Sequence, residues 1–216
     1  MMDKEKVLQR IHDLGVLAVL RGPSKELTLK MVSALVEGGV TGIEITFTTP
    51  NALEVVRALD QKFGSEILLG MGTLTQPDQA QAAKDAGSVF IVSPHTEKKL
   101  AAAMTATGLP VMMGALTPSE VMKARALGSD VVKIFPGSLG GPGYMKSLKG
   151  PFPDVPMMPT GGVSHENLGG WFAAGAFAVG AGSKLCPKNL ALAGEFDQIT
   201  TIAENFLEAI EKARSN

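Results

Sequence analysis

The chain has almost no cysteine, and this scarcity narrows the chemistry open to it. Cys186 is the only cysteine among 216 residues, which excludes an internal disulfide and a multi-cysteine metal site. The three histidines, His12, His95 and His165, stand far apart without the spacing of a metal site. We therefore expect no metal and no other cofactor, and we interpret Cys186 as a small buried apolar side chain.

The chain also lacks an excess of one charge and lacks long apolar runs. Its 20 Lys and Arg residues nearly balance its 21 Asp and Glu residues, whereas a nucleic-acid-binding surface needs a basic excess. No apolar run approaches the roughly 18 residues of a membrane-spanning helix. The first residues, MMDKEKVLQRIHDLG, have the charge pattern of a helix rather than of a leader segment. We expect no nucleic-acid or membrane partner and a cytoplasmic location.

Aliphatic residues, by contrast, are abundant. Hydrophobic residues make up 45% of the chain and aromatic residues only 5%, a composition typical of parallel strands buried on both faces. Short apolar runs alternate with longer amphipathic segments at intervals of roughly 20 to 25 residues, as βα units require. This pattern predicts strands at residues 16–20, 42–47, 67–71, 89–92, 111–113, 130–135, 157–158 and 176–179.

The segments between these runs have the pattern of amphipathic helices. LTLKMVSALVEGG and PDQAQAAKDAG, for example, end on glycine, as helices commonly do. Repeated units of this size, without an early GxGxxG motif, favour a closed barrel over an open doubly wound sheet. No linker or change of composition suggests a second domain. The sequence thus predicts one α/β domain over residues 1–216, a single (β/α)8 TIM barrel with an N-terminal helix.

Two charged side chains fall inside predicted strands. In VVKIFP, Lys133 shares a strand face with Val131 and Phe135, and burial there would favour the neutral amine that can attack a ketone. In GIEITF, Glu44 and Thr46 form a polar face, from which the glutamate could carry protons beside that amine. A structural ion pair fits the same pattern, and the local sequence leaves both interpretations open.

Other polar residues at predicted strand ends are candidates for binding a carboxylate. Arg21, directly after the first strand, could grip a carboxylate with two parallel hydrogen bonds, although an arginine in a surface loop fits equally. Thr73, in GMGTLT, offers a hydroxyl to the same group, although threonine is also common at helix N-caps. Three further residues are candidates for lining the pocket, namely Thr46, Pro94 and Phe135.

Two glycine-rich segments, PTGGV and VGAGS, follow the last two predicted strands. In barrels that bind phosphate, the last two loops commonly form that site, because glycine lets backbone N–H groups approach the anion. A pair of tight turns would have the same sequence. The candidate phosphate-binding residues are Gly161, Gly162, Gly180, Gly182 and Ser183. Ser183 would add a hydroxyl near the start of a helix.

In these segments the chain resembles a known family, the 2-keto-3-deoxy-6-phosphogluconate and 6-phosphogalactonate aldolases, which also includes 4-hydroxy-2-oxoglutarate aldolases. The resemblance runs in order through AVLRG, GGVTGIEITFTTP, GMGTLT, FIVSPH, VVKIFPG, KGPFPDVPMMPTGGVSHEN and AVGAGSKL, and KIFP and PTGGV are its most specific segments. It implies a metal-independent class I aldolase of the Entner–Doudoroff type. Such an enzyme cleaves a phosphorylated 2-keto-3-deoxy sugar acid, or 4-hydroxy-2-oxoglutarate, to pyruvate and an aldehyde such as glyceraldehyde 3-phosphate. The resemblance also implies a homotrimer.

The resemblance further implies roles for single residues. Lys133 would form the Schiff base, Glu44 would be the general acid and base, and Thr73 would contact the carboxylate. Gly161, Gly162 and Ser183 would surround the phosphate. One branch of the family has its carboxylate-binding arginine four residues after the glutamate, and another has it at the end of the first strand. This chain has Thr48 at the first position and Arg21 at the second, which leaves gluconate and galactonate both open as substrates.

Two other functions are compatible with the same fold, because barrels host many chemistries. One is a phosphosugar isomerase or epimerase that uses Glu44 as a base and Lys133 only for its charge. The other is a phosphate-binding protein without catalytic activity. The combination of an inward lysine, a glutamate and an arginine that can bind a carboxylate favours the aldolase over both.

Overall fold

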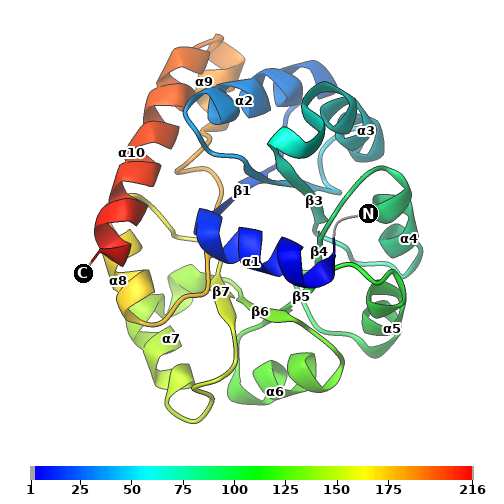
Figure 1. Ribbon diagram of the computed structural model, residues 1–216, viewed down its shortest axis with the longest axis vertical. Helices are drawn as coiled ribbons and strands as arrows, with labels where there is room; N and C mark the ends of the chain where they lie inside the picture. The colour runs from blue at the N-terminus through cyan, green and yellow to red at the C-terminus, as the bar shows by residue number, and fades with distance from the viewer. Residues whose placement is uncertain (1–2, 216) are drawn as a thin grey trace.

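The computed structural model describes residues 3–215 and confirms the predicted (β/α)8 barrel. Eight parallel strands pair in the order β7-β6-β5-β4-β3-β2-β1-β8, and a bridge between Thr160 and Gly180 joins the two ends of this sheet. Figure 1 shows the helices in a ring around the strands. The strands are β1 (Val16–Leu20), β2 (Gly42–Thr46), β3 (Leu68–Gly72), β4 (Ile91–Val92), β5 (Val111–Ala115), β6 (Val131–Ile134), β7 (Met157–Pro159) and β8 (Val179–Ala181).

The predicted N-terminal helix is also confirmed, as α1, and the other helices follow the strands in turn. The helices are α1 (Lys4–Leu14), α2 (Lys25–Glu37), α3 (Ala52–Phe63), α4 (Asp78–Asp85), α5 (Lys98–Ala106), α6 (Pro118–Ala126), α7 (Gly141–Lys149), α8 (Leu168–Ala173), α9 (Lys188–Ala193) and α10 (Phe196–Arg214), with short 3-10 turns η1 (Gly64–Glu66) and η2 (Gly137–Leu139).

Five strands lie within one residue of their predicted bounds, and the other three need a larger correction. The fifth strand extends to Ala115, because Gly114 has strand geometry although it interrupts the apolar run. The fourth strand is shorter than predicted and covers only Ile91–Val92. The eighth begins at Val179 rather than at Ala176, because the Ala176 N–H still bonds to the Trp171 carbonyl at the end of α8.

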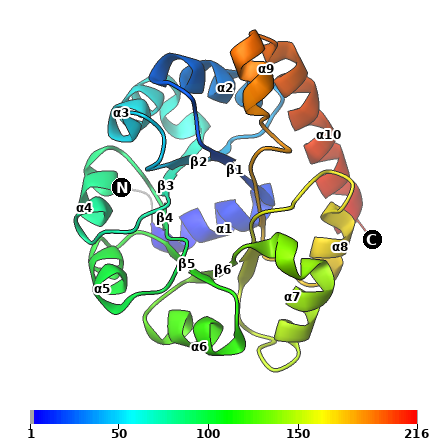
Figure 2. The same ribbon diagram turned by 180° about the vertical axis from the view of Figure 1, so that it is seen from behind.

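Helix α1 covers the amino-terminal end of the barrel. Val7 and Ile11 on this helix pack against Leu17, Phe90 and Met112 inside the barrel. The helix crosses the front of the barrel in Figure 1 and lies behind it in Figure 2. Since α1 occupies this end, chemistry is expected at the opposite end, where parallel strands present their carboxyl termini and the loops that follow them.

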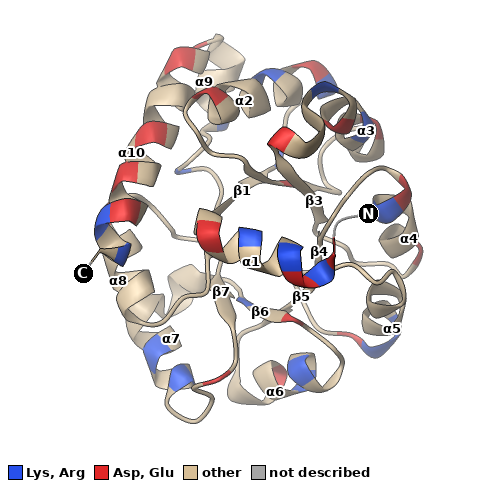
Figure 3. Ribbon diagram, viewed as in Figure 1, with Lys and Arg blue, Asp and Glu red and all other residues tan. Residues whose placement is uncertain are grey.

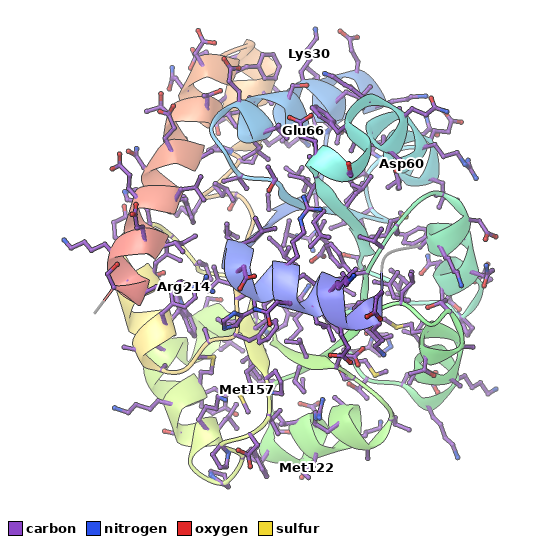
Figure 4. All side chains as sticks on the ribbon, in the orientation of Figure 1. Lys30, Asp60, Glu66, Met122, Met157 and Arg214 are labelled. Atoms are coloured by element: carbon purple, nitrogen blue, oxygen red, sulfur yellow. The ribbon has the colours of Figure 1, made fainter. Side chains whose placement is uncertain are left out.

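The last turn of α10 holds α1 in place. The guanidinium of Arg214 donates hydrogen bonds to the carbonyls of His12 and Asp13, the latter over 2.8 Å, and thereby binds carbonyl groups that the end of α1 leaves unpaired. It also lies 4.9 Å from the ring centroid of Phe172. Figure 4 shows Arg214 at the end of α10, beside α1. Arg214 therefore links the last helix of the chain to the first.

Charged residues lie mainly on the helices and loops, as the colours of the ribbon in Figure 3 show. Buried charge is costly unless it is paired, so this distribution is expected of a barrel packed with aliphatic residues. Glu44 and Lys133 depart from it, since they are 0% and 3% exposed on β2 and β6. Within the part of the chain that the structure describes, no helix is both long and apolar enough to cross a membrane.

Candidate active site

Lys133 and Glu44 face each other inside the barrel. Lys133 Nζ lies 3.8 Å from Glu44 Oε1, too long for a hydrogen bond but within the range of an ion pair. Within residues 3–215, neither carboxylate oxygen of Glu44 has a hydrogen-bond partner, although both are buried. The Lys133 amine also lies 5.3 Å from the ring centroid of Phe135. The predicted inward orientation of both charged residues is confirmed, and the two groups form a buried pair with unused hydrogen-bonding capacity.

Glycine on the neighbouring strand β3 makes room for the buried glutamate. A Cβ on Gly72 would lie 1.8 Å from Glu44 Oε1, and the three atoms nearest to it all belong to that side chain. Gly70, two residues earlier, likewise leaves space for the ring of Phe90. The alternation of inward positions along β3 therefore provides one space for a core aromatic ring and one for a carboxylate.

A cavity of about 130 Å³ lies beside the buried lysine. Lys133 on β6 and Phe135 just after that strand contribute to its wall, and Arg21 contributes from the end of β1. The two predicted glycine-rich loops form much of the remaining wall. Of the predicted site residues, the cavity brings together Lys133, Phe135, Arg21, Gly161, Gly162, Gly182 and Ser183.

The loop after β7 is held in shape by Asn167. Gly161 and Gly162 have φ angles of +93° and +76°, which other residues rarely adopt. Asn167 Nδ2 donates to the Gly162 carbonyl over 2.7 Å, while Asn167 Oδ1 accepts from the Ser164 N–H and from the Trp171 indole. No described residue accepts a hydrogen bond from the Gly162 N–H. The loop thus keeps a backbone donor at the cavity, as binding of an anion requires.

The segment after β8 differs in one respect from the prediction, which placed Ser183 near the start of a helix. Gly182 begins a turn in which its carbonyl accepts from the N–H groups of Leu185 and Cys186, and α9 begins only at Lys188. Ser183 lies in this turn, and no acceptor among residues 3–215 bonds to its N–H. A turn exposes successive N–H groups much as a helix start does, so the correction leaves an anion-binding geometry in place.

Arg21 extends from the end of β1 without an anchor for its charge. No ion pair or hydrogen bond joins its guanidinium to any residue of the described chain. The side chain is exposed and lines both the cavity beside Lys133 and a neighbouring cavity of about 250 Å³. A guanidinium that no carboxylate of the protein neutralises is suited to binding one from a ligand.

Besides Glu44, which lies behind Lys133 as described above, four of the predicted site residues are absent from the wall of this cavity. Thr46 is buried and donates to the Leu20 carbonyl. Gly180 leaves space for Thr160, whose Oγ1 would lie 2.4 Å from a Cβ at that position. Gly114 is the strand partner of Lys133. Because Gly114 has no side chain, the Pro94 carbonyl can lie 2.1 Å from the position that a Cβ of Gly114 would take, which brings Pro94 toward the lysine. The fourth of these residues is Thr73.

Thr73 has an unusual backbone conformation. Its φ angle is +59°, in the left-handed region that a β-branched residue rarely adopts. Its neighbour Leu74 donates to the Val92 carbonyl, which anchors the loop after β3 to β4. Strain of this kind persists where the surrounding structure imposes it, and such positions cluster at functional sites.

The cavity wall also contains residues that the sequence did not single out. Val19 shares the inward face of β1, two residues before Arg21, so strand alternation could have identified it. Thr160 lies within the PTGGV segment, and its buried Oγ1 has no hydrogen-bond partner among the described residues. The remaining two are Val163 and Lys184, of which the lysine directly follows Ser183. Local sequence gave no signal for Lys184, because an exposed lysine is ordinary in a loop.

Cys186 lies beside the site and is chemically protected. It lines the neighbouring cavity with Arg21 and Ser183, but it is only 5% exposed. Burial raises the pKa of its thiol to about 12, which disfavours the reactive thiolate. Residues 3–215 contain no cluster of three or more His, Cys, Asp or Glu side chains that could hold a metal ion. The chemistry of the described site therefore centres on an amine, a carboxylate and a guanidinium.

Comparison with known proteins identifies close relatives over nearly the whole chain. The family model described as KDPG and KHG aldolase matches residues 7–202. A 2-dehydro-3-deoxy-phosphogluconate aldolase of Treponema pallidum (strain Nichols) is 32% identical over 95% of this chain and 96% of its own length. A 2-dehydro-3-deoxy-6-phosphogalactonate aldolase of Escherichia coli (strain K12) is 31% identical over 92% of this chain and 97% of its own length.

A solved structure agrees with these relatives. It is a KDPG aldolase from Legionella pneumophila in which pyruvate was captured at low pH as a covalent carbinolamine intermediate. It superimposes with a TM-score of 0.85 and 28% identity, and the match covers 94% of this chain and 97% of that structure.

Proposed function

Because the chain belongs to the KDPG and KHG aldolase family, we propose that it is a class I aldolase that uses Lys133 to form a Schiff base with a 2-keto acid. One observation carries the proposal: the Lys133 amine is buried 3.8 Å from Glu44, beside a cavity that Arg21 also lines. A buried amine is a nucleophile for ketones, and the imine it forms accepts the electrons released when a carbon–carbon bond breaks. The reaction makes the protein a carbon–carbon lyase.

The reaction begins when Lys133 Nζ attacks the C2 ketone of the substrate. Glu44 takes up the proton that the lysine loses and gives it to the hydroxyl of the resulting carbinolamine, which leaves as water. The protonated imine and the Glu44 carboxylate remain. Glu44 then accepts the proton of the C4 hydroxyl, directly or through a water molecule, as the C3–C4 bond breaks and its electrons flow to the imine nitrogen. The aldehyde leaves, and C3 of the remaining enamine takes up this proton from Glu44. Hydrolysis releases pyruvate and restores the lysine amine.

Two groups in the cavity wall would hold the ends of the substrate. The guanidinium of Arg21 would bind the C1 carboxylate with parallel hydrogen bonds, and Thr73 would support it from the loop after β3. The N–H groups of Gly161, Gly162, Gly182 and Ser183, with the serine hydroxyl, would bind the phosphate on C6. Of the remaining predicted residues, Gly180 would support this loop from below, and Thr46 and Pro94 would shape the pocket.

The solved Legionella relative supports the covalent step. A carbinolamine is the product of adding an amine to a carbonyl group, so pyruvate is bound covalently to an amine in that protein. Among residues 3–215, Lys133 is the lysine that is both buried and in the cavity wall. Lys184 also lines the cavity, but its side chain is exposed and no carboxylate among the described residues lies within ion-pair distance of it.

Trapping with borohydride tests this proposal. The folded protein is incubated with pyruvate, reduced, digested and mapped by mass spectrometry. We expect the added mass on Lys133, and the Lys133→Met variant should gain none. Modification of Lys184 alone, or no modification of the folded protein, would reject the Schiff-base mechanism. The second result would favour the isomerase or epimerase alternative, which uses Lys133 without a covalent step.

The substrate preference needs a separate measurement. We propose a 6-phosphorylated 2-keto-3-deoxy sugar acid, with 2-keto-3-deoxy-6-phosphogluconate and its galactonate epimer as the candidates and 4-hydroxy-2-oxoglutarate as a third. The curated relatives carry names of both epimers. Steady-state kinetics with all three compounds would rank them by kcat/KM. A kcat/KM for 4-hydroxy-2-oxoglutarate that equals or exceeds the values for the two phosphorylated compounds would argue against the phosphate site.

We propose further that the enzyme is a homotrimer that acts in the cytoplasm. An exposed apolar groove of about 220 Å³, which includes Leu116, Leu139 and Tyr144, supports self-association, since Leu139 is 71% exposed. Sedimentation should give the mass of three chains, and a Leu139→Asp variant should shift it toward one. The cytoplasmic location follows from the substrate, because a phosphorylated sugar acid carries too much charge to cross a bilayer unaided. Cell fractionation tests the location.

A further inference from the structure

The loop that carries Arg21 is held by two threonines from the end of β2. The hydroxyl of Thr46 donates to the Leu20 carbonyl over 3.0 Å, and the hydroxyl of Thr49 donates to the same carbonyl over 3.3 Å. Thr49 Oγ1 also accepts a hydrogen bond from the Gly22 N–H over 3.2 Å. The peptide groups on both sides of Arg21 are therefore bound to the end of β2.

These contacts lie away from solvent. Thr46 and Thr49 are 0% and 3% exposed, so water does not compete effectively for their hydroxyls. On the other side, Gly22 packs so closely against α2 that a Cβ there would lie 1.7 Å from Thr28 Oγ1. The backbone at Arg21 is thus confined between β2 and α2. Strands β1 and β2, which carry these residues, lie side by side in Figure 2.

The side chain of Arg21 depends on this confinement. Its guanidinium makes no ion pair or hydrogen bond with residues 3–215, so no protein group fixes the position of its charge. Two parallel hydrogen bonds to a carboxylate require a defined position and angle. Because the Arg21 guanidinium is not anchored, the fixed backbone of Arg21 is what limits the positions that the guanidinium can reach.

We propose that Thr49, together with Thr46, is a positioning residue that sets where the Arg21 guanidinium meets the carboxylate of the bound keto acid; this inference rests on the proposed aldolase function. Neither threonine lines the cavity, so neither touches the substrate. The hydroxyls act through the backbone of Arg21. Loss of a hydroxyl weakens carboxylate binding and leaves the Lys133 and Glu44 chemistry intact.

The test measures pyruvate binding through the Schiff base itself. Borohydride trapping on Lys133 is recorded at increasing pyruvate concentration, which gives a half-saturating concentration and a plateau. Thr49→Val keeps the shape of the side chain but removes the hydroxyl. We expect the half-saturating concentration to rise about tenfold with an unchanged plateau, since small displacements of a binding group have effects of this order. Thr49→Ser, which retains Oγ, should restore the wild-type value.

A double-mutant cycle separates positioning from general damage. In an Arg21→Met background, where the group being positioned is gone, Thr49→Val should change the half-saturating concentration by less than about twofold. An equal rise in both backgrounds would overturn the proposal, and so would an unchanged value in the wild-type background. Thr46→Val removes the other donor to the Leu20 carbonyl and gives the same comparison if Thr49→Val does not fold.

Thr107 provides a matched control at the other end of the barrel. It is 3% exposed, donates to the Met104 carbonyl over 2.6 Å and accepts from the Leu109 N–H over 3.2 Å, so it makes the same two kinds of contact. Thr107→Val should lower the thermal midpoint as Thr49→Val does, without changing pyruvate half-saturation. A matching rise in Thr107→Val would show that loss of stability explains the effect, and would overturn the proposal. No trapping in the wild-type protein would instead reject the Schiff-base mechanism, and the inference with it.

Discussion

The carboxylate of Glu44 occupies the space that any side chain at Gly72 would need. A Cβ on Gly72 would lie 1.8 Å from Glu44 Oε1 and 2.4 Å from the carboxyl carbon. The two residues come from neighbouring strands, and the glycine allows the acid to extend inside the barrel toward Lys133, 3.8 Å away. Gly72 thus determines where the carboxylate of Glu44, the proposed general acid and base, can lie.

Gly72→Ala should therefore disable catalysis without removing any catalytic group. The new methyl group displaces the Glu44 carboxylate, and kcat should fall by about 100-fold, the lower range for loss of a general acid–base. Steady-state kinetics measure this fall, while pyruvate trapping on Lys133 shows that the site remains folded. Gly143→Ala on α7, where nothing lies within 4 Å of the added carbon, is the control. A kcat within about twofold of wild type for Gly72→Ala would contradict the assignment of Glu44.

Removal of one member of the buried pair should cost stability, and removal of both should cost less. Lys133→Met leaves the buried Glu44 carboxylate unpaired, and the free energy of unfolding should fall by about 3 kcal/mol. Adding Glu44→Gln should recover a large part of that loss. Urea unfolding measures both. Lys30→Met, which breaks the exposed pair with Glu26, should leave the same quantity nearly unchanged, because exposed ion pairs contribute little to stability. A double variant no more stable than Lys133→Met would refute the pairing argument.

Asn167→Ala should impair binding of phosphorylated substrates selectively. The substitution releases the Gly162 carbonyl and removes the acceptor of the Trp171 indole, so the loop loses the shape that directs its N–H groups. We expect KM for the phosphorylated sugar acid to rise about tenfold. Turnover of 4-hydroxy-2-oxoglutarate, which has no phosphate, should change little. Asn189→Ala, on an exposed position of α9, is the control. Equal losses for both substrates would argue against a phosphate-binding loop.

Cys186 should resist alkylation although it lies next to the cavity. Burial raises its pKa from 9.0 to about 12; at pH 8 this lowers the thiolate fraction roughly 1000-fold, and alkylation requires the thiolate. The rate of iodoacetamide labelling in the folded protein should be lower by at least that factor than in urea, where the thiol is exposed. Raising the pH toward the folded pKa should accelerate labelling. Rapid labelling of the folded protein at pH 8 would show that the thiol is not buried.

Strand alternation predicted much of the site, because it depends only on neighbouring residues. The apolar neighbours of Lys133 and Glu44 placed both charged groups on inward faces, and the structure confirms both orientations. The same reasoning ended β5 too early, because Gly114 contributes no hydrophobic signal. Its lack of a side chain makes room for the Pro94 carbonyl and the His95 backbone nitrogen. Those contacts join two segments that sequence periodicity does not relate.

Thr46 illustrates the limit of such reasoning. The sequence identified it as a pocket residue because it shares a strand face with Glu44, and it is indeed buried on that strand. Its hydroxyl, however, bonds to the Leu20 carbonyl on β1. Which acceptor a buried hydroxyl reaches depends on the register and tilt of adjacent strands, and local sequence carries neither.

The sequence by itself determined that this chain forms eight βα units, that Lys133 and Glu44 face inward, and that glycine-rich loops follow the last two strands. These properties arise from periods of two and 3.6 residues and from backbone conformations that glycine permits. Only the tertiary structure decided that Gly72 makes room for Glu44 and that Thr49 holds the loop of Arg21. Both depend on contacts between strands, which the closure of the barrel brings into register.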